Sequence, residues 1–259
     1  MDYQYLVTEI ENKVALVTIN HDPGNKLNTQ VYLELTRLMN ELEANENVRA
    51  IVITGAGREA FVAGAEIEEM VDLDTVGMMN LTQITRVSFS RIENINKPVI
   101  AAVNGEARGG GLELALCADL RIASDNAQFS FPEINLGVIP GGGGTQRIQK
   151  LVGLGAAKEL LYFGEPISAE RAYQLNIVNK VVSQDKLLAT AKEWAEKLAQ
   201  KAPVAMRQMK LAVNTGSNVD LETALTIEAT AYDGAFATQD RREGMSARLE
   251  NRKPNYTGK

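Results

Sequence analysis

The feature that most constrains this chain is a recurring order of short apolar strand, glycine-bearing loop and helix. Residues 50–54 (AIVIT) and 99–103 (VIAAV) are wholly apolar segments, typical of strands in a sheet that helices cover on both faces. Strands at 120–123 and 128–131 precede another glycine loop and a helix near 145–151. The unit recurs roughly every fifty residues. This repeat favours an α/β protein built from stacked ββα turns over a simple doubly wound sheet.

The two ends of the chain differ in pattern. Near the N-terminus, a strand at 14–19 is followed by Asn28, a plausible N-cap for an amphipathic helix. From Gln184 onward the chain is predicted to be helical, and Pro203 is expected to open one of these helices. We therefore expect a ββα core over residues 1–200 and a C-terminal helical region over 201–259 that packs on a sister subunit.

Composition excludes several classes of protein. The 259 residues are 45% apolar and 23% charged, as in an ordinary globular protein. One cysteine, Cys117, and one histidine, His21, make a metal site improbable, so we expect none. The net charge of −6 opposes binding to nucleic acid or to an anionic membrane. No signal peptide and no membrane-spanning segment are evident, which predicts a cytoplasmic protein.

Two of the glycine-bearing loops have the composition of anion-binding helix starts. Small residues at Ala63, Gly64 and Ala65 allow a ligand to approach the backbone, and a helix is expected to begin near Glu66. The alternative for this loop is a tight turn that needs small residues. Residues 109–111 are three glycines before an apolar helix, with Glu113 in its first turn. Close strand–helix packing and an ordinary N-terminal glutamate explain this second loop equally well.

A third loop places Glu133 after a proline in a largely apolar stretch. Desolvation there would raise the pKa of Glu133 and suit it to proton transfer. The alternatives are a capped turn or a pair with an arginine. The glycines at 141–144 are not followed by Gly-Lys-Ser/Thr, and those at 109–111 do not fit G-x-G-x-x-G, so neither nucleotide-binding motif is present.

Together these segments resemble the crotonase (enoyl-CoA hydratase/isomerase) family. The resemblance covers nearly the whole chain and is carried by FVAGAEIEEM at 61–70, NGEARGGGLELALCADLRIAS at 104–124, FSFPEINLGVIPGGGGTQR at 129–147 and EGMSARLENRKP at 243–254. It implies a crotonase-like spiral of ββα units. It also implies C-terminal helices that build a homotrimer, commonly assembled as a homohexamer, a dimer of trimers.

The resemblance assigns a catalytic role to five positions. It implies that the amides of Ala65 and Gly110 form an oxyanion hole for the thioester enolate. Glu113 and Glu133 fall on the two glutamates of the hydratases, and Gly141 falls on a glycine whose amide helps to position the water. We expect Glu113 to activate the water and Glu133 to deliver a proton to C2. Because both glutamates are retained, hydration is favoured over a double-bond shift.

The resemblance also implies contacts with coenzyme A. Ala63 falls where a backbone group recognises the adenine, and the adjacent Gly64 and Ile67 are included in the predicted contact. Lys26 is also included among the predicted contacts with coenzyme A, although it stands where alanine is usual. Lys253 is the better candidate for a phosphate contact, often made across a subunit boundary.

Two further side chains have open alternatives. Phe236 either lines the acyl tunnel or is simply buried on its helix. Arg108, where a small or apolar residue is usual, either points outward or touches the coenzyme phosphates.

The sequence therefore predicts an enoyl-CoA hydratase of fatty-acid β-oxidation. Its partner is an acyl-CoA thioester substrate, and we expect no cofactor, because coenzyme A enters as part of that substrate. The alternatives are another crotonase-fold reaction, such as enoyl-CoA isomerisation, and a noncatalytic or RNA-binding protein of the same fold. The retained glutamates and the acidic balance argue against the RNA-binding alternative.

Overall fold

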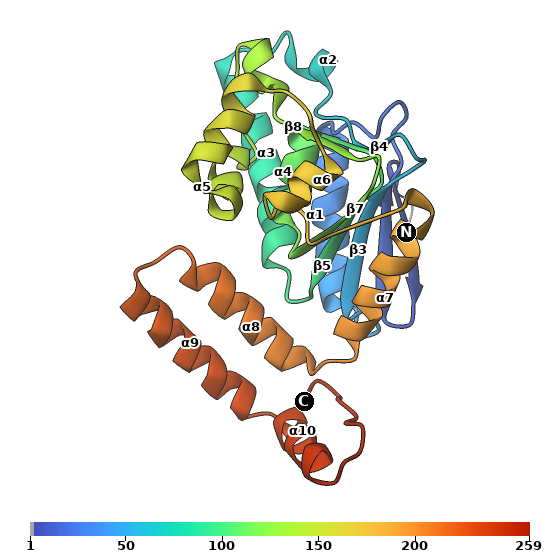
Figure 1. The fold of residues 1–259 in the computed structure, drawn as a ribbon, viewed down its shortest axis with the longest axis vertical. Coiled ribbons are helices and arrows are strands. Elements are labelled where there is room, and N and C mark those ends of the chain that lie inside the picture. The colour runs from blue at the N-terminus through green and yellow to red at the C-terminus, as the bar shows by residue number, and fades with distance from the viewer. Residues whose placement is uncertain (1–2) are drawn as a thin grey trace.

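The structure, a computed structural model, describes residues 3–259 and contains two β-sheets (Figure 1). The larger sheet has the order β1-β2-β3-β5-β7-β10 and is parallel except for the β1–β2 pair. Its strands are β1 (Leu6–Glu11), β2 (Val14–Ile19), β3 (Ala50–Gly55), β5 (Val99–Val103), β7 (Leu120–Ser124) and β10 (Lys180–Val182). The smaller sheet has the order β4-β6-β8-β9, with β4 (Ala60–Val62), β6 (Glu106–Arg108), β8 (Gln128–Ser130) and an antiparallel β9 (Ile167–Ser168).

The chain alternates between the two sheets and then forms helices, which confirms the predicted ββα spiral. β3 leads to β4, β5 to β6, and β7 to β8, so each turn adds one strand to each sheet. The helical segments that follow these pairs are α2 (Ile67–Met70) and α3 (Thr75–Asn94), then α4 (Gly110–Cys117), and then η1 (Pro132–Leu136) and α5 (Gly144–Phe163). Each of the strands β4, β6 and β8 of the smaller sheet is therefore followed by a loop or by the start of a helix.

The central strands β3 and β5 of the larger sheet are buried on both faces because helices cover them from either side. On one face, Val52 and Ile100 pack with the apolar side of α7 (Leu187–Ala199). On the other, Ile51 and Ile53 belong to the main core with α1 (Thr29–Ala44), α3 and α4. All six residues of β3 are buried, as expected for a strand between two helical layers.

The helices agree with the sequence prediction in part. The side chain of Asn28 accepts a hydrogen bond from Val31 N, which confirms it as the N-cap of α1. Helix α5 runs well beyond the predicted segment, with a kink at Gly153. Helix α3 was not predicted, because its buried positions include the polar residues Thr85 and Ser88, which weaken the apolar period. Short α6 (Ala169–Gln174) and η2 (Gln184–Lys186) connect the later strands and α7.

The C-terminal helices form an arm that extends away from the two sheets (Figure 1). It consists of α8 (Pro203–Gly216), α9 (Leu221–Phe236) and α10 (Gln239–Leu249), and Pro203 opens α8 as predicted. Lys210 on α8 pairs with Asp119 of the body at 2.8 Å. A division of the chain at residue 200 and packing on a sister subunit stay predictions.

Among residues 3–259, no helix is both long and apolar enough to cross a membrane.

Asn104, directly after β5, fixes the point where the chain passes from one sheet to the other. Its side-chain amide nitrogen donates to the carbonyls of Gly55, Gly57 and Ala60 at 3.0, 3.0 and 3.2 Å. Its Oδ1 accepts from Gly55 N at 3.1 Å. The side chain is buried, so these backbone groups rely on it in place of water.

Replacing Asn104 with alanine is expected to lower the free energy of unfolding by about 2–4 kcal/mol, because several buried backbone groups lose their partner. Denaturant unfolding at a fixed protein concentration measures this change. Asn94→Ala is the matched control, since Asn94 is exposed and donates only to Ser90 O. Equal stability losses in the two variants would contradict the role given to Asn104.

Candidate active site

Two backbone amides from different ββα turns lie side by side. Leu27 pairs with Ala65 in a parallel bridge through the bonds Leu27 N to Gly64 O and Glu66 N to Leu27 O, both 2.9 Å. This pairing turns the Ala65 N–H away from Leu27. Gly110 is the first residue of α4, so its N–H has no partner within the helix. A β-carbon on Gly110 would lie 3.7 Å from Ala65 N, which places the two predicted oxyanion donors next to each other.

Glu113 lies in the first turn of α4, as predicted, and is only 4% exposed. Its Oε1 accepts hydrogen bonds from Gly142 N at 2.8 Å and from Gly144 N at 2.7 Å. Burial raises the pKa of Glu113, while these amides and the charge of Arg147 oppose the rise. The carboxyl group is thereby fixed in position at a site where its charge is costly.

Glu133 lies at the start of η1, against the glycines that open α4. A β-carbon on Gly109 would lie 2.7 Å from Glu133 Oε1 and would displace that carboxyl group, and Gly109 has φ +50°, a backbone conformation that favours glycine. Burial raises the pKa of Glu133 to about 7, and the negative charge of Glu113 adds to the rise. Within residues 3–259, its buried Oε2 has no hydrogen-bond partner. Glu133 is thus able to gain or lose a proton near neutral pH.

The glycine run before α5 holds Glu113. A β-carbon on Gly142 would lie 2.7 Å from Glu113 Oε2 and 2.6 Å from the Phe89 ring. One on Gly144 would lie 2.6 Å from Phe131. The sequence analysis missed the roles of Gly142 and Gly144, for which the glycine run was the available signal. Gly141 faces open space, and the predicted role of its amide with the water stays a prediction.

Four residues predicted to contact coenzyme A lie next to the Leu27–Ala65 bridge in the sequence: Lys26, Ala63, Gly64 and Ile67. Ala63 N donates to Gly24 O at 2.9 Å, and a β-carbon on Gly64 would lie 3.5 Å from Arg108 O. Lys26 lies 3.6 Å from Glu68 of α2, and Ile67 opens that four-residue helix with half of its surface exposed. The predicted contacts themselves stay predictions.

The Arg108 side chain points outward. It is about half exposed and forms an ion pair with Glu106 on the same strand. This geometry favours the structural alternative for Arg108.

Phe236 and Lys253 lie on the arm, apart from the glutamates within one chain (Figure 1). Phe236 contacts the Arg241 guanidinium, 4.2 Å from its ring centroid, and stacks with Tyr232 at 5.7 Å. Lys253 is exposed in the segment after α10. Their predicted contacts with substrate therefore require a site on another copy of the chain.

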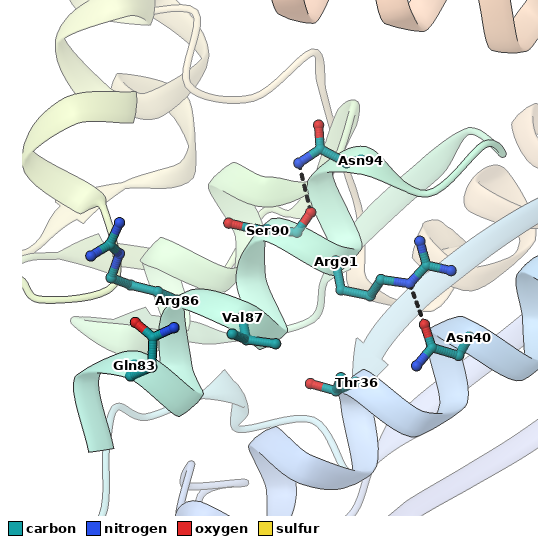
Figure 2. Close-up of a pocket in the computed structure, with 8 residues that line it drawn as sticks. All are labelled: Thr36, Asn40, Gln83, Arg86, Val87, Ser90, Arg91 and Asn94. Carbon is teal, nitrogen blue, oxygen red and sulfur yellow. Dashed lines mark hydrogen bonds between the residues drawn. The ribbon is translucent and has the colours of Figure 1, made fainter. Parts of the chain in front are cut away.

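A polar groove between α1 and α3 is separate from this site (Figure 2). It is lined by Thr36, Asn40, Gln83, Arg86, Val87, Ser90, Arg91 and Asn94. Its Arg91 is bound to Asn40 and Glu43. Nowhere in residues 3–259 is a group of three or more His, Cys, Asp or Glu side chains placed to hold a metal ion.

Comparison with known proteins gives matches over the full chain. The family model described as enoyl-CoA hydratase/isomerase matches residues 9–259. A short-chain-enoyl-CoA hydratase of Clostridium acetobutylicum is 44% identical over 98% of this chain and 97% of its own. A crotonyl-CoA hydratase of Syntrophomonas wolfei is also 44% identical, over 100% of both chains. A crystal structure of an enoyl-CoA hydratase from Bacillus anthracis superimposes with a TM-score of 0.95 at 38% identity, covering 99% of this chain and 100% of that one.

The raised pKa of Glu133 predicts a stability change that is independent of activity. The unfolded chain loses this proton near pH 4.5 and the folded protein near pH 7, so stability falls as the pH rises through this range, and the loss is complete above it. Glu133→Gln is therefore expected to be more stable than the parent at about pH 8, by about 1–2 kcal/mol after allowance for solvent screening. Most of the advantage should be lost near pH 5, where the folded parent keeps its proton.

Urea unfolding at the two pH values measures this difference, with Glu46→Gln as an exposed control. An advantage of Glu133→Gln that is the same at both pH values would show that Glu133 ionises normally.

Proposed function

The chain is an enzyme of the enoyl-CoA hydratase/isomerase family, and we propose that it adds water to short trans-2-enoyl-CoA thioesters to give 3-hydroxyacyl-CoA. The observation that carries the proposal is the pair Glu113 and Glu133, which interact electrostatically beside the adjacent amides of Ala65 and Gly110. Hydration needs both kinds of group, a site for negative charge and groups that move protons.

The two amides would act on the thioester oxygen. As water attacks C3, negative charge develops on this oxygen through the conjugated double bond. Preorganised N–H donors stabilise such charge, and losing one of them typically costs about 3–4 kcal/mol. Ala65 and Gly110 suit this role because their positions are set by backbone pairing and by the start of a helix, not by mobile side chains.

The two glutamates would act on the water and on C2. The oxygen of the water bonds to C3 while Glu113, held by two amides, accepts a proton from that water. Glu133 donates a proton to C2. The double bond becomes a single bond, and one molecule of water is added in total. A pKa near 7 suits Glu133 to proton donation, and the Gly141 amide is proposed to help position the water.

Both glutamates favour hydration over isomerisation. A shift of the double bond moves one proton between carbon atoms and adds no water, so one acid/base group suffices. Here both carboxyl groups are present in different environments: one is bound to two amides, and the other has a buried oxygen with no partner among the described residues. The names of the two relatives at 44% identity support the same choice.

The proposed substrate is a short-chain acyl thioester, supported by the names of these relatives. Coenzyme A would enter as part of this substrate, and the reaction as written needs no further cofactor. We also propose a role in fatty-acid β-oxidation, which produces 2-enoyl-CoA thioesters that must be hydrated. The cytoplasmic compartment expected from the sequence stays a prediction.

The arm supports assembly into a homotrimer or a dimer of trimers. Large apolar side chains on α8 and α9 and between them are exposed in the single chain: Met209, Leu211, Val213, Val219, Leu221, Leu225 and Tyr232. Large apolar side chains exposed together on one helix pair commonly mark a subunit interface. Packing of the arm on a neighbouring copy would also give Phe236 and Lys253 a site to contact.

Glu113→Gln and Glu133→Gln are each expected to lower kcat for hydration of crotonyl-CoA by about 10²–10⁴-fold, because each removes one proton-transfer group. The loss of absorbance of the conjugated thioester measures the rate, and Glu46→Gln is the exposed control. A well-folded parent with no hydratase activity would refute the proposal. Conversion of a 3-enoyl-CoA to its 2-enoyl isomer by that parent would then identify an isomerase.

Lys253→Gln is expected to raise KM several-fold with little change in kcat, because a contact with the coenzyme phosphate binds ground and transition states alike. The same substitution should have no effect on a substrate that lacks the 3′-phosphate. Lys201→Gln, at another exposed lysine, is the control. A rise in KM that persists without the 3′-phosphate would contradict a contact with that group.

A further inference from the structure

Arg147, in the first turn of α5, is bound to the glycine run that holds Glu113. Its Nη1 donates to Gly142 O at 2.8 Å. The same Gly142 donates its N–H to Glu113 Oε1 at 2.8 Å. One residue of the run thus connects the guanidinium group to the carboxylate.

Arg147 is itself held by a second element. Its Nη2 lies 2.7 Å from Glu93 Oε2, and its Nε donates to Glu93 Oε1 at 3.3 Å. Glu93 lies near the end of α3; the Arg147 side chain is largely buried, at 18% exposed, and that of Glu93 is partly buried, at 35%. The guanidinium therefore binds two carboxylate oxygens and one carbonyl at once, a fork of donors that lysine cannot supply.

The run fits closely between Arg147 and Glu113. A β-carbon on Gly143 would lie 2.2 Å from Arg147 Nη1, and one on Gly142 would lie 2.7 Å from Glu113 Oε2. The guanidinium therefore occupies the space beside Gly143, and the carboxylate occupies the space beside Gly142. A shift of Arg147 would move the amides that fix Glu113.

We propose that Arg147, anchored by Glu93, is a positioning residue for hydration: it holds the carbonyl of Gly142, and the N–H of the same residue keeps Glu113 in place. This inference rests on the proposed hydratase function, since it assigns a role within the same site. Arg147 touches no reacting atom in this account and acts only through Gly142 and through its charge.

The charge of Arg147 also acts on Glu113. The titratable groups around Glu113 are Arg147 on α5, Glu133 on η1, Tyr32 on α1 and Cys117 on α4, with Glu93 on α3 behind Arg147. Arg147 is the cation of this set, and it lowers the pKa of Glu113 against the rise caused by burial. Its removal should raise the pKa of Glu113 and reduce the ionised fraction at mildly acidic pH.

Arg147→Gln and Arg147→Lys separate geometry from charge. The glutamine variant is expected to lose about 10- to 100-fold in kcat for crotonyl-CoA, with KM within about twofold, because a misplaced catalytic group slows the chemical step. The acidic limb of its kcat–pH profile should move to higher pH. The lysine variant should lose about tenfold in kcat, with the acidic limb where the parent has it, because charge remains while the fork is lost.

The controls distinguish this inference from the proposed function. Arg171→Gln, at an exposed arginine of α6, should behave as the parent. If both the parent and Arg171→Gln fail to hydrate crotonyl-CoA, the proposed function itself is wrong. If both are active and Arg147→Gln matches them in kcat and pH profile, only the positioning role is wrong.

A purely structural role would give a different pattern. It predicts that Arg147→Gln loses kcat together with thermal stability while its acidic limb stays in place, and this result would overturn the proposal. Should Arg147→Gln fail to fold, Glu93→Gln removes the anchor and leaves the arginine charge. It is then expected to lower kcat about tenfold with little change in KM, and an unchanged kcat in that variant would contradict the proposal.

Discussion

The site is organised around one buried carboxylate and the two backbone amides that bind it. Glu113 is almost fully buried, yet Gly142 and Gly144 donate to its Oε1, so hydrogen bonds offset part of the cost of burying the charge and also fix its position. This contact joins the second ββα turn, which supplies α4, to the third, which supplies the glycine run before α5. It explains why the chain carries glycines there, since β-carbons would collide with the carboxylate and with neighbouring aromatic rings.

The second carboxyl group has the opposite environment, and the contrast gives the pair its chemistry. Glu133 is partly buried with a pKa of about 7, and its Oε2 lacks a partner in the described chain. An unpaired buried oxygen typically costs about 1–3 kcal/mol, a penalty that proteins tend to retain at functional sites. One group is thus fixed by donors, and the other can exchange a proton near neutral pH. Two unlike carboxyl groups beside a pair of adjacent backbone amides match the requirements of adding water to a conjugated thioester.

Local signals made much of the fold predictable. The apolar strands, Asn28 as an N-cap, Pro203 at a helix start and Glu113 in a first turn all follow from short-range rules, and the structure confirms them. Helix α3 escaped prediction because buried Thr85 and Ser88 interrupt its apolar period. The family resemblance identified the glutamates and the two amides. It did not identify Gly142, Gly144 or Arg147, because which amides of a glycine run face a distant carboxylate depends on tertiary packing.

The central claim is that Glu113 and Glu133 act as one unit on one water molecule, and a double-variant cycle tests it most directly. Rates of crotonyl-CoA hydration are compared for the parent, Glu113→Gln, Glu133→Gln and the double variant. If the two groups serve a single concerted addition, the double variant loses little more than the worse single variant, because either loss already disables the unit. Losses in kcat that multiply in the double variant would show that the two glutamates contribute independently and would contradict the account.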